Sequence, residues 1–156
     1  MVGEGTTAIF ITFLLAMIGY GGLTAVILLS ARGTLPARLL RVVAVVVLTH
    51  VIMVWTFRYE WQFPLAVRNG YAGFIMFHCA LLLILASTIS RERVARPLIQ
   101  LAFVVVTIGA LGATFVYDVV AMYRVPVILC ALAGFGGLIW EHVIQRKQTK
   151  ATSRTV

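Results

Sequence analysis

The chain has 156 residues, of which 62% are hydrophobic, and its formal net charge at pH 7 is +8. Its mean hydropathy of +1.02 far exceeds that of soluble domains, which excludes a soluble globular protein. The basic residues stand at the ends of apolar runs, where they act as orientation signals in membrane proteins, so we expect no nucleic-acid binding.

The first apolar run covers about residues 6–30, enough to cross the hydrocarbon core of a bilayer. No basic segment precedes it and no small-residue cleavage site closely follows a short core, so we expect a permanent span and not a signal peptide. Four further runs predict an all-α integral membrane protein with five spans. The predicted spans are residues 6–30, 36–58, 69–90, 97–117 and 125–144.

Prolines and charged segments set the predicted boundaries between the spans. Pro36, Pro97 and Pro126 suit the first helical turns of the second, fourth and fifth spans, because the first turn has no need of the missing N–H. Residues 91–96 are then a charged loop. Residues 1–145 form a single bundle, and we expect the basic tail, residues 146–156, to be solvated and partly disordered.

The distribution of basic residues predicts the orientation. With the N-terminus outside and the C-terminus in the cytoplasm, ten basic residues lie inside and three outside, which satisfies the positive-inside rule of a bacterial inner membrane protein. The ten are Arg32, Arg38, Arg41, Arg91, Arg93, Arg96, Arg146, Lys147, Lys150 and Arg154, and the three are Arg58, Arg68 and Arg124.

Two of the three histidines stand deep within the predicted spans, where ionisable side chains are costly and usually mark a site, whereas His142 lies at the inner boundary of the fifth span. His50 lies eight residues before Arg58, and His78 nine residues after Asn69. At about 1.5 Å per residue, both imidazoles lie roughly 12–14 Å below the same outer surface. Gly109, Gly112 and Gly134 fall near this depth. The sequence therefore predicts a layer of two imidazoles with room for a planar group.

Neutral imidazole is a common axial ligand of haem iron, and facing helices of a bundle can present two of them. We therefore hypothesise a small membrane protein of the cytochrome b type, with haem b between His50 and His78. Arg58 and Arg68 would bind the propionates, and the three glycines would line the macrocycle. It would pass electrons between the outer face and a partner subunit or a quinone, the second candidate cofactor. The layout resembles cytochrome b subunits of respiratory complexes in architecture alone.

Two other readings remain open. Each histidine can instead hydrogen-bond to a neighbouring helix in a non-catalytic structural or assembly subunit of a larger membrane complex, or in a homo-oligomer. A small permeation protein with a histidine-lined path is the third reading. No hydrolase motif is present and no catalytic residue is identified, so any enzyme activity would be an oxidoreduction. Cys79 and Cys130 are not spaced as a disulfide or zinc pair.

Overall fold

The computed structural model describes the backbone of residues 2–152 and the side chains of residues 7–144. The described part is helical and contains no strand. Its elements are α1 (Val2–Ser30), α2 (Ala37–Phe57), α3 (Phe63–Ala66), α4 (Tyr71–Ile89), α5 (Glu92–Val116), the 3₁₀ helix η1 (Asp118–Tyr123) and α6 (Arg124–Thr152). Five helices, α1, α2, α4, α5 and α6, are long and apolar enough to cross a membrane. The predicted all-α class is confirmed for the described residues, which contain five helices able to span a membrane, as expected for a multi-pass membrane protein.

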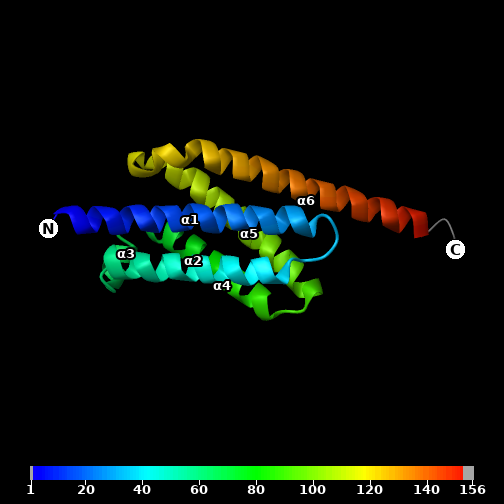
Figure 1. Ribbon diagram of the computed structural model, residues 1–156, viewed down its shortest axis with the longest axis horizontal. Helices are drawn as coiled ribbons and strands as arrows, with labels where there is room; N and C mark the ends of the chain where they lie inside the picture. The colour runs from blue at the N-terminus through cyan, green and yellow to red at the C-terminus, as the bar shows by residue number, and fades with distance from the viewer. Residues whose placement is uncertain (1, 153–156) are drawn as a thin grey trace.

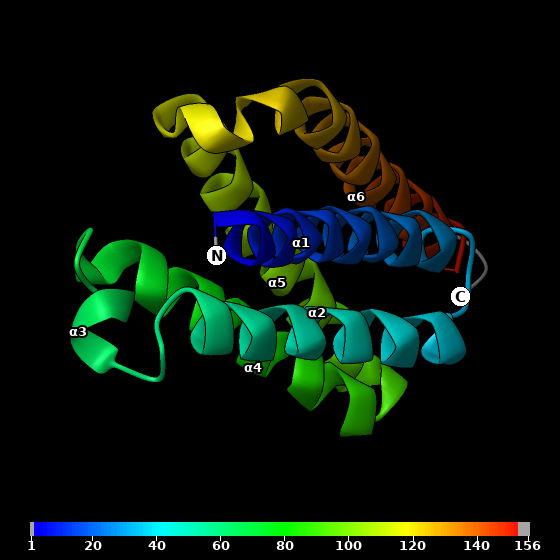
Figure 2. The same ribbon diagram turned by 60° about the vertical axis from the view of Figure 1, so that its left-hand side comes forward.

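α1, α2 and α6 run lengthwise along the bundle, with α1 between the other two, and α5 crosses them obliquely (Figure 1). α1 packs against α2, α5 and α6, while α4 packs mainly against α5. Turned by 60°, the bundle shows α1 between α2 and α6, with α5 crossing obliquely behind them (Figure 2). α1 and α5 are therefore the two central helices, and side chains from both form most of the interior.

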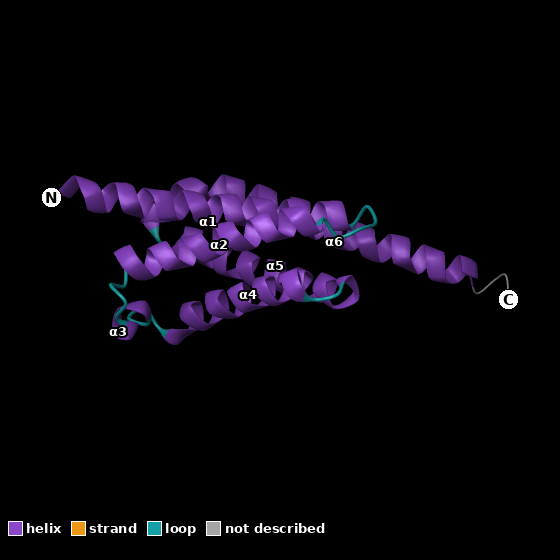
Figure 3. Cartoon of the chain, turned by 60° about the horizontal axis from the view of Figure 1, so that its bottom comes forward, coloured by secondary structure: helices purple, strands orange, loops and turns teal. Residues whose placement is uncertain are grey.

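The bundle has two ends, which we name by a feature of each. At the α3 end, α2 stops, α4 begins and η1 joins α5 to α6. At the Arg96 end, the loop of residues 31–36 joins α1 to α2, and a short connection joins α4 to α5. α6 continues beyond the other helices at this second end (Figures 1 and 3).

The core is apolar and depends on close helix contacts at glycines. A Cβ on Gly22 would lie 2.7 Å from Val43, and one on Gly19 would lie 2.8 Å from Val47, so α1 and α2 approach each other where α1 lacks side chains. The largest cluster of buried residues comprises Tyr20, Leu23, Val26, Ile27, Leu40, Val43, Ala44, Ile84, Ile99, Ala102, Phe103 and Val127.

One predicted helix boundary was wrong. α5 begins at Glu92 and not at Pro97, so the predicted charged loop forms its first turn. Glu92 there interacts favourably with the helix dipole and pairs with Arg96 four residues later, which favours helix before the proline. The apolar part of α6 ends at Ile144, as predicted, and the helix continues to Thr152, so part of the expected tail is helical.

Candidate functional site

His50 is tied to α1. Its Nδ1 lies 2.8 Å from the backbone oxygen of Thr12, so the imidazole, which is partly buried, bridges α2 and α1. Because a carbonyl oxygen only accepts hydrogen bonds, Nδ1 must carry the proton in this contact. The lone pair of the neutral ring is then on Nε2. Thr12 itself is buried, and its hydroxyl donates to the oxygen of Ile9.

His78 is tied to α2. The Nε1–H of Trp55 donates to its Nε2 at 3.1 Å, while its Nδ1 lies 2.8 Å from the oxygen of Phe74. The two contacts require the same neutral tautomer, with the proton on Nδ1. The imidazole also stacks on the Phe74 ring, with centroids 4.0 Å apart. Both nitrogens of His78 are thus engaged within the chain.

These contacts direct the two histidines to different helix pairs. His50 faces the α1–α2 interface, whereas His78 meets Trp55 at the α2–α4 interface. Along α2, His50 and Trp55 are five residues apart, which separates their directions by about 140° on a helix of 3.6 residues per turn. The predicted pair therefore lies on adjoining interfaces and does not share hydrogen bonds.

The three predicted glycines also lie in different surroundings. A Cβ on Gly109 would be 2.6 Å from the ring of Phe77, while one on Gly134 would overlap the ring of Phe103. Gly112 is exposed and has no atom within 4 Å of a Cβ position. Aromatic side chains of the chain itself therefore occupy the space that the sequence assigned to a planar ligand at Gly109 and Gly134.

Trp55 is the centre of an aromatic cluster at the α3 end, near the predicted cation sites. Its ring stacks on Trp61 at a centroid distance of 5.8 Å and meets Tyr59 edge-on at 5.7 Å. Glu60 and Trp61 have φ values of 49° and 58°, and this left-handed turn folds Trp61 back over α2. The predicted propionate ligands Arg58 and Arg68 are exposed at the same end.

Arg96 and Glu141 form a second polar cluster, which the sequence did not predict because Arg96 was assigned to a loop. Nη1 of Arg96 lies 2.9 Å from Oε1 of Glu141, a carboxylate that is only 8% exposed. Nε2 of Gln100 donates to the other oxygen, Oε2, at 3.0 Å. The spacing of Glu92 and Arg96 was the available signal, since a pair four residues apart favours helix.

The guanidinium of Arg96 joins four parts of the chain. It donates to Ser30 at the end of α1 at 3.1 Å, to Gly33 in the following loop, and to Glu92 on its own helix at 2.7 Å. With Glu141 on α6, these acceptors surround the cation. The cluster can lock the Arg96 end of the bundle together.

The described side chains offer interhelical hydrogen bonds and one ion-paired cluster as their main polar features. Within residues 7–144, no group of three or more His, Cys, Asp and Glu side chains is close enough to hold a metal ion. Both cysteines, Cys79 and Cys130, are free thiols. Comparisons of the chain with protein families, curated proteins and solved structures found no match.

Proposed function

We propose that the chain is a non-catalytic structural or assembly subunit of a larger membrane complex. One observation carries this proposal: three polar contacts within the spans join helices of this chain to one another. His50 binds α1, Trp55 of α2 binds His78 of α4, and the hydroxyl of Tyr20 on α1 lies 2.9 Å from that of Thr107 on α5.

These contacts have a structural effect in a membrane. Interhelical hydrogen bonds in lipid contribute about 0.6–2 kcal/mol each, because the hydrocarbon core offers few other partners. In a haem protein, Nε2 of His78 would be needed as a ligand, whereas here Trp55 donates a hydrogen bond to it. The three contacts fix the relative positions of α1, α2, α4 and α5, which favours a scaffold.

We propose α6 as the contact element of this scaffold. It projects beyond the other helices at the Arg96 end, and its sequence there carries Arg146, Lys147 and Lys150. We place this end in the cytoplasm of a bacterium, with the N-terminus outside, because the basic residues are concentrated on that side. A partner with an acidic surface next to the membrane fits this arm.

The experiment measures the mass of the complex extracted into native nanodiscs. We expect a particle with a defined partner in fixed stoichiometry, which is lost when Arg146, Lys147 and Lys150 are replaced by Glu. Arg38→Glu, on an exposed position of α2, is the control and should retain the partner. A particle that contains only a folded single copy of the chain would contradict the proposal.

Haem binding is the second candidate, favoured by the geometry of Nδ1. In both histidines Nδ1 lies 2.8 Å from a backbone carbonyl oxygen, the arrangement that orients Nε2 as a metal ligand. The donor chemistry fits haem iron. The space fits less well, since Trp55 contacts Nε2 of His78 and Phe77 fills the surface at Gly109, so both side chains would have to move.

An absorbance spectrum of the purified protein tests this candidate. Haem b gives a Soret band and reduced visible bands, and the bands should be lost in His50→Ala and in His78→Ala. Electron transfer to a quinone or a partner subunit would follow only from a protein with these bands. The cells are grown with excess haem precursor. If the purified protein is then colourless and still unfolds cooperatively, which shows that it is folded, haem binding is ruled out.

A further inference from the structure

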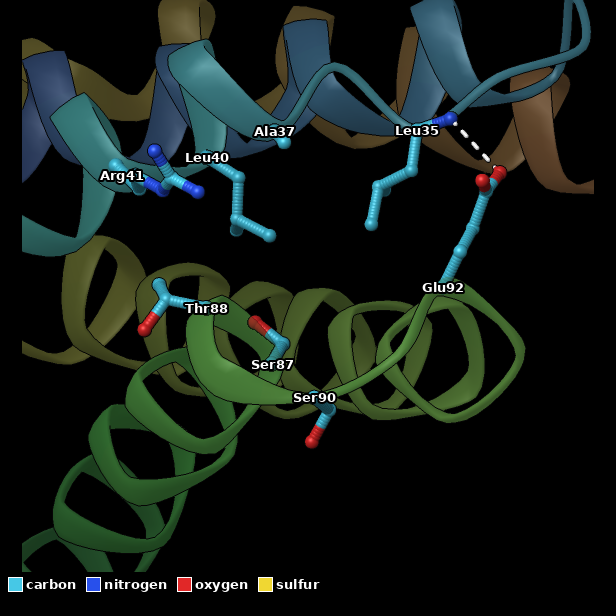
Figure 4. Close-up of a pocket in the computed structure, with 8 residues that line it drawn as sticks. All are labelled: Leu35, Ala37, Leu40, Arg41, Ser87, Thr88, Ser90 and Glu92. Atoms are coloured by element: carbon cyan, nitrogen blue, oxygen red, sulfur yellow. Dashed lines mark hydrogen bonds between the residues drawn. The ribbon is translucent and has the colours of Figure 1, made fainter.

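A hollow of about 150 Å³ opens at the Arg96 end between the start of α2 and the α4–α5 connection (Figure 4). This volume is about ten times the roughly 10–15 Å³ that one water molecule requires. Leu35 and Leu40 supply apolar surface, and the polar lining consists of Arg41, Ser87, Thr88, Ser90 and Glu92. The hollow therefore has room for a small polar group with an apolar neighbour.

Its position in the bundle is that of a lipid headgroup. The lining comes from the loop before α2, the first residues of α2, the last turn of α4, Ser90 in the connection that follows, and the first residue of α5. Helix ends of spanning segments lie at the level where hydrocarbon meets water. A phospholipid in the adjoining leaflet can thus reach the hollow without leaving the bilayer.

One end of the hollow carries hydrogen-bond acceptors. The hydroxyl of Ser87 donates to Ile84 of its own helix and points toward the hollow in Figure 4, so its lone pairs face a ligand, whereas the hydroxyls of Thr88 and Ser90 point away from the hollow. The carboxylate of Glu92 accepts from the backbone N–H of Leu35 and from Arg96 through Oε1. Its Oε2 makes no hydrogen bond to any described residue. A donor with several N–H groups would suit this side.

The other side carries a cation. Arg41 is exposed on α2 and forms no ion pair with the side chains described for residues 7–144. In Figure 4 its guanidinium and the carboxylate of Glu92 stand at opposite ends of the hollow. An arginine at this position suits a phosphate, which accepts charge-assisted hydrogen bonds.

We propose that this hollow binds the phosphoethanolamine headgroup of a phospholipid, with its phosphate on Arg41 and its ammonium on the carboxylate of Glu92 beside Ser87. A primary ammonium matches a carboxylate and a hydroxyl oxygen because it has three N–H donors. Choline fits poorly, because recognition of a quaternary ammonium uses aromatic side chains and none lines this hollow. A phosphoglycerol headgroup leaves the carboxylate of Glu92 without a cationic partner from the ligand.

The test measures lipid dissociation constants by native mass spectrometry of the full-length protein in detergent. The lipids share the same acyl chains and carry ethanolamine, its mono- and dimethylated forms, choline or glycerol. We expect the affinity to fall with each methyl group and to be about tenfold lower for choline than for ethanolamine, since each methyl removes one N–H donor. Equal binding of all five headgroups, or tightest binding of the glycerol lipid, would overturn the proposal.

Two variants locate the site. Arg41→Ala should weaken binding of the ethanolamine lipid about tenfold through the lost phosphate contact, whereas Arg38→Ala, three residues earlier and outside the lining, should leave it unchanged. Ser87→Ala should weaken it less, through loss of one acceptor. Unchanged binding in Arg41→Ala, or an equal loss in Arg38→Ala, would overturn the assignment.

Soluble phosphoethanolamine separates the two sources of this headgroup. We expect millimolar phosphoethanolamine to displace the lipid only partly, because the lipid also gains from its acyl chains. Complete displacement at micromolar concentration would show that the site serves a soluble ligand and would overturn the lipid assignment.

Discussion

Arg96 on α5 and Glu141 on α6 form an ion pair between residues that are 45 positions apart in the sequence. The guanidinium is 20% exposed and the carboxylate 8%, so the pair is shielded from water at the edge of the bundle. Each partner is also hydrogen-bonded to further groups, Glu141 to Gln100 and Arg96 to Ser30. This satisfies the condition under which a buried charge is tolerated.

Removal of the carboxylate should destabilise the protein. We expect Glu141→Gln to lower the free energy of unfolding by about 2–3 kcal/mol, because Arg96 loses one of its two anionic partners while it stays largely buried. Denaturant unfolding in mixed micelles measures this change. Glu60→Gln, on an exposed residue at the other end, is the matched control and should change stability by less than about 0.5 kcal/mol. Equal stability of the two variants would contradict the role of the pair.

Gly134 is expected to accept no side chain. Gly134→Ala should cost about 1–3 kcal/mol, since its Cβ would overlap the ring of Phe103, which is fully buried and stacks on Tyr20. Gly136→Ala, two residues later on an open surface, should be neutral or stabilising by up to about 1 kcal/mol through helix propensity. Thermal unfolding of both variants in the same detergent measures the two changes in stability. If Gly134→Ala left the stability unchanged, α5 and α6 would be able to move apart to make room for the added Cβ.

The hydrogen bond between Trp55 and His78 should appear as a coupling energy. Trp55→Phe and His78→Phe each remove one partner and keep an aromatic ring in place, so the double-mutant cycle isolates the contact. We expect a coupling of about 1 kcal/mol in the free energy of unfolding. Additive effects of the two substitutions would mean that the rings pack without this bond. Trp55→Phe paired with Thr56→Ala is the control cycle, because the hydroxyl of Thr56 donates to Ile52 of its own helix and, among the side chains of residues 7–144, to no other helix.

The left-handed turn after α2 should be relieved by glycine. Glu60 has a φ of 49°, a conformation that costs a residue with a Cβ about 1–2 kcal/mol. We therefore expect Glu60→Gly to be neutral or stabilising by up to about 1 kcal/mol, even though glycine gains entropy on unfolding. Gln62→Gly, at a φ of −99°, should destabilise. Thermal unfolding of the two variants gives the comparison, and a less stable Glu60→Gly would mean that the glutamate side chain itself contributes.

The candidate site was predictable only in part. The sequence indicated that His50 and His78 lie in the spans and that hydrogen bonds to other helices could satisfy them, and the structure contains such bonds. The sequence could not indicate that the two rings face different helix pairs. Counting residues from the predicted membrane surface gives the depth of a side chain along its helix, but not the rotation of that helix about its axis. The rotation of α2 depends on its contact with α1 at Gly19 and Gly22.

The sequence by itself determined that this protein is all-helical and has five segments able to span a membrane. This follows because a lipid-facing chain must satisfy its backbone hydrogen bonds locally and must keep about 20 apolar residues in each span. Only the tertiary structure decided the partners of Arg96, Glu141, His50 and His78. It also decided that the ring of Phe103 packs against Gly134, where a Cβ would otherwise stand. Those contacts join residues that are distant in the chain, and they depend on how the helices rotate and cross, which is a property of packing and not of any single segment.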